Sequence, residues 1–216
     1  MSKLTDQALA LHKEHHGKIE MHSKVPLQKA KDLTLAYSPG VAAPCLEIKK
    51  DYIKLYDSTN TRNTVAVVPN GSAVLGLGNI GAGAGLPVME GKSILFKGFA
   101  GVDSVPICLD TQDVDEIVRA VELMAPTFGG INLEDIKAPQ CFDVERRLRE
   151  KLDIPVFHDD QHGTAIVVVS ALINAFKLTG RKFEESKFVL NGAGAAGQAI
   201  THLIHSMGGH DIILCD

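Results

Sequence analysis

The stretch Phe157-His158-Asp159-Asp160-Gln161-His162-Gly163-Thr164-Ala165 joins two kinds of predicted structure. An apolar strand is predicted before it, at residues 154–157, and a long helix after it, at residues 164–178. The two adjacent carboxylates therefore follow the carboxyl end of a strand and precede a helix. Open α/β sheets bind their ligands at that position. The stretch predicts an α/β fold whose functional site includes this acidic pair.

A second acidic pair, Glu134-Asp135, closes another short apolar run, Ile131-Asn132-Leu133. Two such pairs, each after a strand and far apart along the chain, are typical of a divalent-cation site that folding assembles. The alternative is that these acids are helix caps or surface charges, as single carboxylates usually are.

Composition bounds the class of protein. The 216 residues are 45% hydrophobic and 22% charged, which is enough material for one large domain or two small ones. The net charge of -4 gives no reason to expect nucleic acid or an anionic membrane as a partner. The longest apolar stretch, residues 165–176, falls short of the roughly 20 residues that a membrane span needs. The four cysteines are widely spaced without a C-x-x-C pair, which predicts reduced thiols and a cytoplasmic location.

Strands alternate with helices from residue 104 onward, which predicts βαβ units and a parallel sheet. We expect strands at 105–109, 130–133, 154–157, 187–190 and 212–215, and helices at 114–124, 142–152, 164–178 and 195–207. Before them we expect helices at 4–20, 41–50 and 88–96, and a hairpin of residues 64–68 and 73–77. The boundary between a first domain, 1–162, and a second, 163–216, is expected near His162-Gly163.

The loop Gly192-Ala193-Gly194-Ala195-Ala196-Gly197 follows a predicted strand and opens a predicted helix. Its glycines allow a tight turn and a close approach to a pyrophosphate at the helix amino end. Asp216 closes the next strand, 19 residues beyond Gly197, where its carboxylate would accept hydrogen bonds from the hydroxyl groups of the adenosine ribose. These features predict the start of a Rossmann-type dinucleotide-binding domain, and Asp216 favours NAD because it would repel a 2′-phosphate. The alternative is a Gly-rich packing turn.

A second loop, Gly76-Leu77-Gly78-Asn79-Ile80-Gly81, fits the same pattern. Gly83, Gly85 and Pro87 follow it, however, and these residues are unfavourable at the start of a long helix. We expect this loop to form a backbone-lined wall near a small anionic substrate. The chain ends after one βαβ unit, so the sequence also predicts a fragment with an unfinished dinucleotide domain.

The stretch from Phe157 to Ala165 matches the malic enzyme signature F-x-D-D-x-x-G-T-A. The segment Tyr37-Ser38-Pro39-Gly40-Val41-Ala42, the pair Glu134-Asp135 and the loop at 192–197 occur in that family's order. The sequence thus resembles the malic enzymes, particularly the shorter bacterial type, over about the first half of a member's length. The resemblance implies oxidation and decarboxylation of L-malate to pyruvate with NAD or NADP and Mg²⁺ or Mn²⁺, in a homodimer or larger assembly.

The resemblance also implies roles for individual residues. Tyr37 corresponds to the general acid and Lys92 to the general base. The implied metal ligands are Glu134, Asp135 and Asp160, and the implied cofactor loop is Gly192, Ala193, Gly194, Ala195, Ala196 and Gly197. The longer eukaryotic members have a malate-binding Arg where this chain has Ser72-Ala73-Val74, so carboxylate recognition here must come from elsewhere.

The implied ligand set contains only oxygen donors, which suits Mg²⁺ or Mn²⁺ better than zinc. We expect Asp159 to orient the ligands. A zinc site that uses His158 and His162 is an alternative, but a strand followed by a turn does not place residues four apart on one face.

In the implied reaction, Lys92, with its pKa lowered by burial and by the metal, takes the C2 hydroxyl proton while hydride passes to the nicotinamide. Tyr37 then protonates C3 of the enolate. Lys97 is an alternative base, and Lys137 is a candidate for substrate contact. Two further functions stay open: a metal-dependent oxaloacetate decarboxylase, and a metal- and substrate-binding fragment that is inactive by itself.

Overall fold

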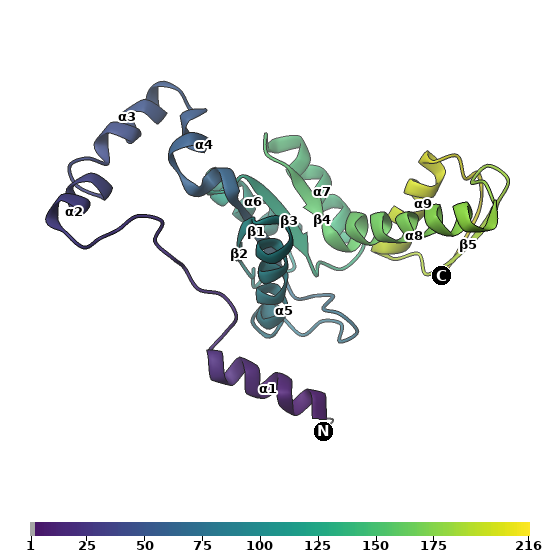
Figure 1. Ribbon diagram of the computed structural model, residues 1–216. Coiled ribbons are helices and arrows are strands. Elements are labelled where there is room, and N and C mark those ends of the chain that lie inside the picture. Colours follow the sequence, from purple (N-terminus) through teal and green to yellow (C-terminus); the bar gives the residue numbers. More distant parts are fainter. Residues whose placement is uncertain (1–2) are drawn as a thin grey trace.

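The computed structural model describes residues 3–216, which contain two parallel sheets (Figure 1). The first sheet has the strand order β2-β1-β3-β4. Its strands are β1 (Thr64–Pro69), β2 (Asp103–Pro106), β3 (Gly130–Glu134) and β4 (Val156–His158). All three pairings are parallel, so the predicted α/β class with a parallel sheet is confirmed. The central strands are mostly apolar and almost completely buried, as expected for strands that helices cover on both faces.

The strand order places the helices and the site. From β1 the chain passes through α5 (Ala82–Leu95) to β2 on one side, then through α6 (Val114–Met124) to β3 on the other. Right-handed crossovers in opposite directions put α5 on one face of the sheet and α6 and α7 (Gln140–Lys151) on the opposite face. The order reverses between β1 and β3, so the crevice at their carboxyl ends is the expected ligand position.

The main core lies between the sheet and the α6–α7 face. It includes Ala66 and Val68 of β1, Ile117 and Val121 of α6, and Leu148 of α7, all fully buried. Asp113 caps α6 by accepting from the backbone N–H of Glu116 at 3.0 Å. The bounds of α6 agree with the sequence prediction because its apolar period and its cap are both clear.

A second unit follows β4. A π-helical turn, η4 (Asp159–Gly163), leads directly into α8 (Thr164–Thr179). The chain continues through β5 (Lys187–Asn191), α9 (Ala195–Ser206) and β6 (Asp211–Cys215), and β5 and β6 pair in parallel. Val169, Phe188 and Ile204 form its small core.

The helical run Asp159–Thr179, in which η4 extends α8, is long and apolar enough to cross a membrane, with a mean hydropathy of 1.3. The expectation that no apolar segment reaches this length is therefore not met. One such segment is weak evidence by itself, and this one begins with the acidic pair of the first sheet and packs Val169 into the second core.

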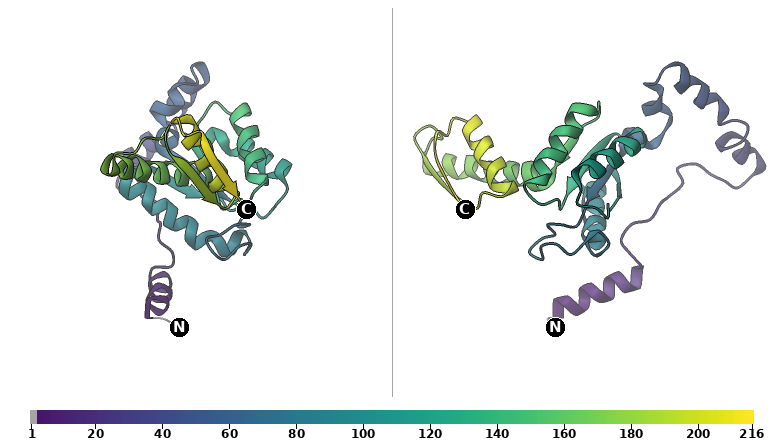
Figure 2. Two further views of the ribbon diagram at one scale, coloured as in Figure 1. Left: turned by 90° about the vertical axis from the view of Figure 1, so that its right-hand side faces the viewer. Right: turned by 180° about the vertical axis from the view of Figure 1, so that it is seen from behind.

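Of the four amino-terminal helices, the first three lie away from the sheet, and the fourth adjoins the turn that leads into β1 (Figures 1 and 2). They are α1 (Lys3–His15), α2 (Ala30–Ala36), α3 (Ala42–Lys50) and α4 (Lys54–Ser58), and none of their residues is buried. Short helical turns lie at η1 (Asn60–Asn63), η2 (Phe96–Ala100) and η3 (Ala125–Thr127). The sequence predicted neither α2 nor α4.

The predicted hairpin at residues 64–77 is wrong. The backbone carbonyl of Gly71, at φ +72°, accepts from the N–H groups of Ile80 and Gly81 at 3.1 Å, which closes residues 71–81 into a loop. Only an isolated bridge between Val74 and Gly78 remains.

The predicted start of the next helix at residue 88 is also wrong. Helix α5 begins at Ala82 and contains Gly83, Gly85 and Pro87. Gly85 is buried, and a Cβ there would lie 3.6 Å from the side chain of Val74, so this turn of the helix packs against the loop. Tertiary packing has outweighed helix propensity at these positions.

Candidate active site

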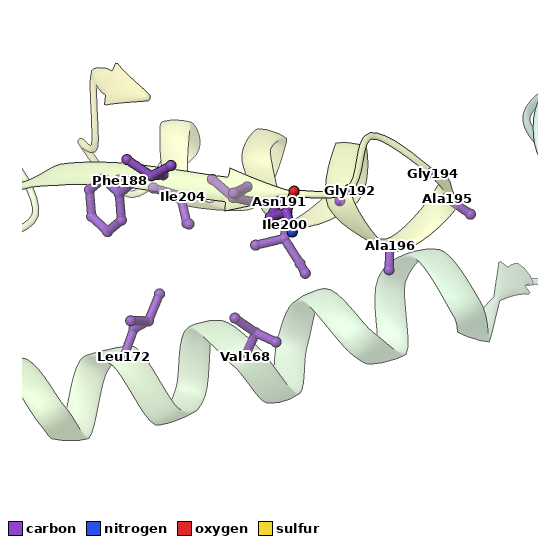
Figure 3. Close-up of a pocket in the computed structure, with 13 residues that line it drawn as sticks. Val168, Leu172, Phe188, Asn191, Gly192, Gly194, Ala195, Ala196, Ile200 and Ile204 are labelled. Carbon is purple, nitrogen blue, oxygen red and sulfur yellow. The ribbon is translucent and has the colours of Figure 1, made fainter. Parts of the chain in front are cut away.

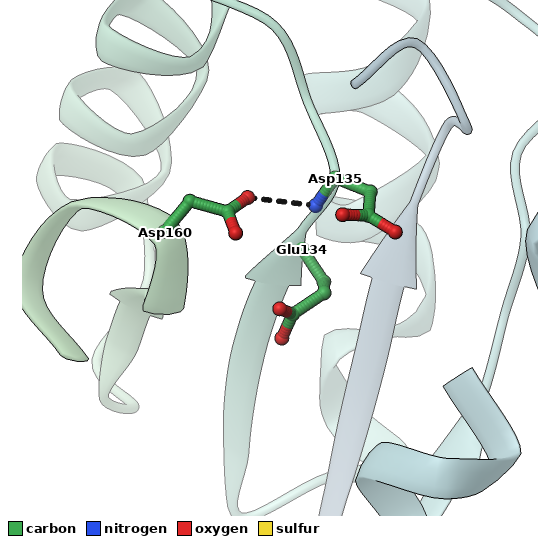
Figure 4. Close-up of side chains that lie close together, drawn as sticks. All are labelled: Glu134, Asp135 and Asp160. Atoms are coloured by element: carbon green, nitrogen blue, oxygen red, sulfur yellow. Dashed lines mark hydrogen bonds between the residues drawn. The ribbon is translucent and has the colours of Figure 1, made fainter. Parts of the chain in front are cut away.

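Three carboxylates meet where β3 ends (Figure 4). Glu134 is the last residue of β3, Asp135 follows it, and Asp160 reaches across from the turn η4. One carboxylate oxygen from each residue lies within 4.8 Å of the others. The structure thus brings together all three residues that the resemblance implied as metal ligands.

The backbone at Asp135 is left-handed, with φ +51°, which is uncommon for a residue other than glycine. Its carbonyl accepts from the N–H groups of Ser72 and Ala73 at 3.2 Å, and its own N–H donates to Asp160 Oδ2 at 2.9 Å. These hydrogen bonds fix the turn at Asp135, after β3, against the segment that follows β1 and against η4.

Ser72 is buried, and its hydroxyl donates to Asn70 Oδ1 at 2.6 Å and accepts from the backbone N–H of Lys137 at 3.0 Å. This residue therefore ties the end of β1 to the segment after β3, and it belongs to the stretch Ser72-Ala73-Val74, where the resemblance implies an Arg in the longer members. Its hydroxyl is committed to these contacts.

The sequence argument missed Asn132, which lies two residues before Glu134 on the same face of β3. Its side-chain amide donates to Glu134 Oε2 at 2.8 Å and orients that carboxylate. The available signal in the sequence was an amide residue inside an otherwise apolar predicted strand, residues 130–133.

Burial and mutual repulsion favour the neutral form of each acid. Burial raises the pKa of Glu134 to about 7, and the charges of Asp159 and Asp160 add to the rise. Burial and the charge of Asp160 raise the pKa of Asp135 to about 6, and burial also raises the pKa of Asp160. Asp135 Oδ2 is buried without a hydrogen-bond partner. A hard cation would supply the missing partner and relieve the repulsion, so the residues fit Mg²⁺ or Mn²⁺.

Lys92 reaches this cluster from α5. Its Nζ donates to Asp159 Oδ2 at 2.7 Å and lies 3.3 Å from Glu134 Oε1. Burial alone would lower the pKa of Lys92, but the hydrogen bond to Asp159 and the charge of Glu134 outweigh burial, and the pKa is raised. The expected fall is therefore not found in this arrangement. Asp159, which the sequence analysis expects to orient metal ligands, accepts this hydrogen bond from Lys92.

Gly163 leaves room for this contact, since a Cβ there would lie 2.2 Å from Asp159 Oδ1. Gly163→Ala is expected to displace Asp159 from Lys92 and to lower kcat/KM about tenfold, because small misplacements of reacting groups are costly. The backbone of Gly163 is already helical, at φ -61° and ψ -49°, so thermal stability should stay unchanged or rise slightly. Steady-state kinetics and thermal melting test both parts, and full activity of the variant would contradict the first.

Two histidines flank the acidic pair, and the Nε2 atom of one of them, His158, lies 3.5 Å from Asp160 Oδ2. Burial lowers the pKa of His158 to about 4, and His162 Nε2 lies 2.7 Å from Glu145 Oε1. Within residues 3–216, the carboxylate triad is the one group of three or more side chains placed to share a metal ion. This geometry favours the oxygen-only site over the zinc alternative.

Other predicted residues lie elsewhere. Tyr37, which follows α2, is 67% exposed, and Figure 1 shows α2 away from the sheet. Lys97 is exposed and pairs with Asp103 at 2.6 Å. Neither residue is brought to the carboxylates within one chain. The loop Gly76–Gly81 folds back on Gly71, next to Ser72, and so lies at the carboxyl end of β1.

The predicted dinucleotide loop lies at the end of β5. A pocket of about 610 Å³ extends along this loop, β5, α8 and α9 (Figure 3). Gly192 has φ +117°, and a Cβ at Gly197 would lie 1.8 Å from the carbonyl oxygen of Gly192. Both positions therefore require glycine. Asp216 Oδ1 accepts from the backbone N–H of Ala193 at 3.1 Å, so its carboxylate lies against this loop.

The family model "Malic enzyme, N-terminal domain" matches residues 16–149, and "Malic enzyme, NAD binding domain" matches residues 161–211. The "Bifunctional malic/malolactic enzyme" of Bacillus subtilis is 61% identical over 99% of this chain and 52% of its own length. The "NADP-dependent malic enzyme" of Rhizobium meliloti is 56% identical over all of this chain and 29% of its own length.

A solved malic enzyme structure from Pyrococcus horikoshii has a TM-score of 0.95 and 52% identity, covering 98% of this chain and 50% of that one. The malic enzyme of Entamoeba histolytica has a TM-score of 0.95 at 37% identity, covering 99% and 46%. The chain thus spans about half the length, or less, of these relatives. Both family models, and the shared fold along the whole chain, show that this chain belongs to the malic enzyme family.

Proposed function

We propose that the whole protein to which these residues belong oxidises and decarboxylates L-malate to pyruvate and CO₂, with reduction of NAD or NADP. The observation that carries this proposal is the carboxylate triad beside Lys92, at the point where the strand order reverses. The names of the relatives, which include both NAD- and NADP-dependent malic enzymes, support it.

Glu134, Asp135 and Asp160 would hold Mg²⁺ or Mn²⁺, which when bound supplies Lewis acidity at the C1 carboxylate and C2 oxygen of malate. Lys92 Nζ would accept the proton of the C2 hydroxyl during oxidation at C2, for which a bound NAD or NADP would be the hydride acceptor. The hydrogen bond to Asp159 and the charge of Glu134 raise the pKa of Lys92, so the base role requires that these carboxylate charges be offset, as a bound cation would do. Asp159 holds Nζ in place through its hydrogen bond.

Tyr37, the proposed general acid, enters this site from a second copy of the chain. The amino-terminal helices α1–α4 bury none of their described residues and expose apolar side chains beside Tyr37, among them Leu33, Leu35 and Val41. Such a surface fits a homodimer whose copies exchange these helices.

Complementation tests the shared site. Tyr37→Phe and Lys92→Ala are each expected to be inactive, whereas equal amounts refolded together should recover about a quarter of wild-type activity. Half of the dimers then contain one chain of each variant. In each of these, one of the two sites combines an intact Lys92 with an intact Tyr37, and the other site lacks both. Each variant mixed with itself is the control. Absence of recovery in verified mixed dimers would show that Tyr37 acts within its own chain.

Asp216 supports NAD over NADP, because a carboxylate at the end of β6 would repel a 2′-phosphate. We also propose two domains, residues 1–162 and 163–216, because one parallel sheet falls in each. The cytoplasm is the proposed compartment, since Cys45, Cys108, Cys141 and Cys215 are all free thiols.

Product analysis tests the reaction. We expect malate-dependent formation of NADH or NADPH together with pyruvate, dependent on added Mn²⁺. Pyruvate from oxaloacetate without dinucleotide, and none from malate, would indicate the decarboxylase alternative. Lactate is measured in parallel because the Bacillus subtilis relative is named a bifunctional malic/malolactic enzyme. The 216 residues alone are expected to form little NADH or NADPH, because their second sheet contains two strands, fewer than a dinucleotide domain uses.

A further inference from the structure

The turn η4 contacts the molecule on two sides. On one side Asp159 bonds to Lys92 and Asp160 accepts from the backbone of Asp135. On the other side, the next two residues, Gln161 and His162, contact helix α7. Five residues thus connect the carboxylate cluster to a helix that lies outside it.

Glu145 is the contact on α7. Its Oε2 accepts from Gln161 Nε2 at 3.1 Å, and its two carboxylate oxygens lie 2.7 and 2.9 Å from His162 Nε2. The Glu145 side chain is only 8% exposed. A buried carboxylate is costly unless it is bonded in this way, so the contact is built into the fold and is not an incidental surface pair.

Helix α7 provides a fixed base for this contact. On the same helix, Cys141, Val144 and Leu148 are fully buried in the main core. Glu145 is therefore held by packing, whereas η4 is a single turn of π-helix, a rare conformation that mostly occurs at functional sites. The rigid element can set the position of the turn.

We propose that Glu145 is a positioning residue for the metal site. By holding Gln161 and His162 against α7, it fixes η4 so that Asp160 meets Asp135 and Glu134 and Asp159 meets Lys92. This inference rests on the proposed function, since it assigns Glu145 to the site where the cation would bind.

Mn²⁺ binding to the full-length protein tests the inference, measured from the electron paramagnetic resonance of free Mn²⁺ well below the melting temperature. Glu145→Ala is expected to raise the Kd for Mn²⁺ about tenfold, a typical effect of removing a group that orients metal ligands. Glu145→Gln keeps a carbonyl oxygen that can accept from Gln161, so it should restore part of the affinity.

Glu150→Ala is the matched control. Glu150 lies on the same helix, but its side chain is 61% exposed and pairs with Arg146, so this variant should bind Mn²⁺ like the wild type. If Glu145→Ala fails to fold, Gln161→Met carries the test, because it removes one donor while keeping the length of the side chain. It should also raise the Kd.

A lower melting temperature with an unchanged Kd in the Glu145 and Gln161 variants would show that the contact only stabilises the fold, and would overturn the inference. Absence of Mn²⁺ binding by the wild type would instead overturn the proposed function. The two failures are therefore distinguishable.

Discussion

Replacement of Lys92 with alanine is expected to lower kcat/KM for malate oxidation by about 10²- to 10⁴-fold, the usual contribution of a general base. Lys92 Nζ lies 3.3 Å from Glu134 and 2.7 Å from Asp159, which places it at the carboxylate cluster. Because Lys92 is a cation and not a ligand, its loss should leave the affinity for Mn²⁺ at pH 8 undiminished. Steady-state kinetics and Mn²⁺ titration measure the two quantities separately.

Lys97→Ala is the control for this prediction. Lys97 lies five residues further along the chain, but its side chain is 61% exposed and pairs with Asp103 at the surface, so its loss should change kcat/KM little. Substantial turnover by the Lys92 variant would remove this residue from the base role. Loss of activity in the Lys97 variant alone would transfer the role to Lys97.

The affinity for Mn²⁺ is expected to rise about 100-fold between pH 5.5 and pH 7.5, since each proton that must leave contributes up to tenfold per pH unit. The pKa values of Glu134 and Asp135 are raised to about 7 and about 6, so both acids are largely protonated at pH 5.5. Protons then compete with the cation, and the competition ends as the pH rises through these values. The pKa of His158 lies at about 4, outside this window.

Glu134→Gln tests the origin of this pH dependence. An amide cannot ionise, so the variant should bind Mn²⁺ more weakly and show a shallower dependence on pH. Binding is measured in buffers that do not coordinate metal ions. An affinity that does not change over this range in the wild type would show that these acids do not release protons when the cation binds.

Local patterns in the sequence predict much of the fold. The alternation of strands and helices after residue 104 predicts a parallel sheet, and the bounds of α6 follow from its apolar period and from Asp113 as cap. The glycines of the loop from Gly192 to Gly197 are visible in the sequence itself, and the structure shows the steric reason for Gly192 and Gly197. Signals of this kind depend on residues that are close together along the chain, so the sequence is enough to predict these elements.

The start of α5 shows where local signals fail. Gly83, Gly85 and Pro87 argue against a helix, yet α5 includes all three. The loop that closes on Gly71 sets its beginning, and that closure depends on residues about ten positions apart. Propensity is a weak predictor where packing decides.

The sequence by itself determined the chemistry available: two acidic pairs at strand ends, a glycine loop for a dinucleotide, and the membership of a family. The tertiary structure decided which groups meet. Asp160 reaches the end of β3 because β4 pairs with β3. Lys92 reaches the same place from α5, which covers the face of the sheet opposite to α6 and α7. It also decided the direction of the Lys92 pKa, because a charge is stabilised by its neighbours in space and not by its neighbours along the chain.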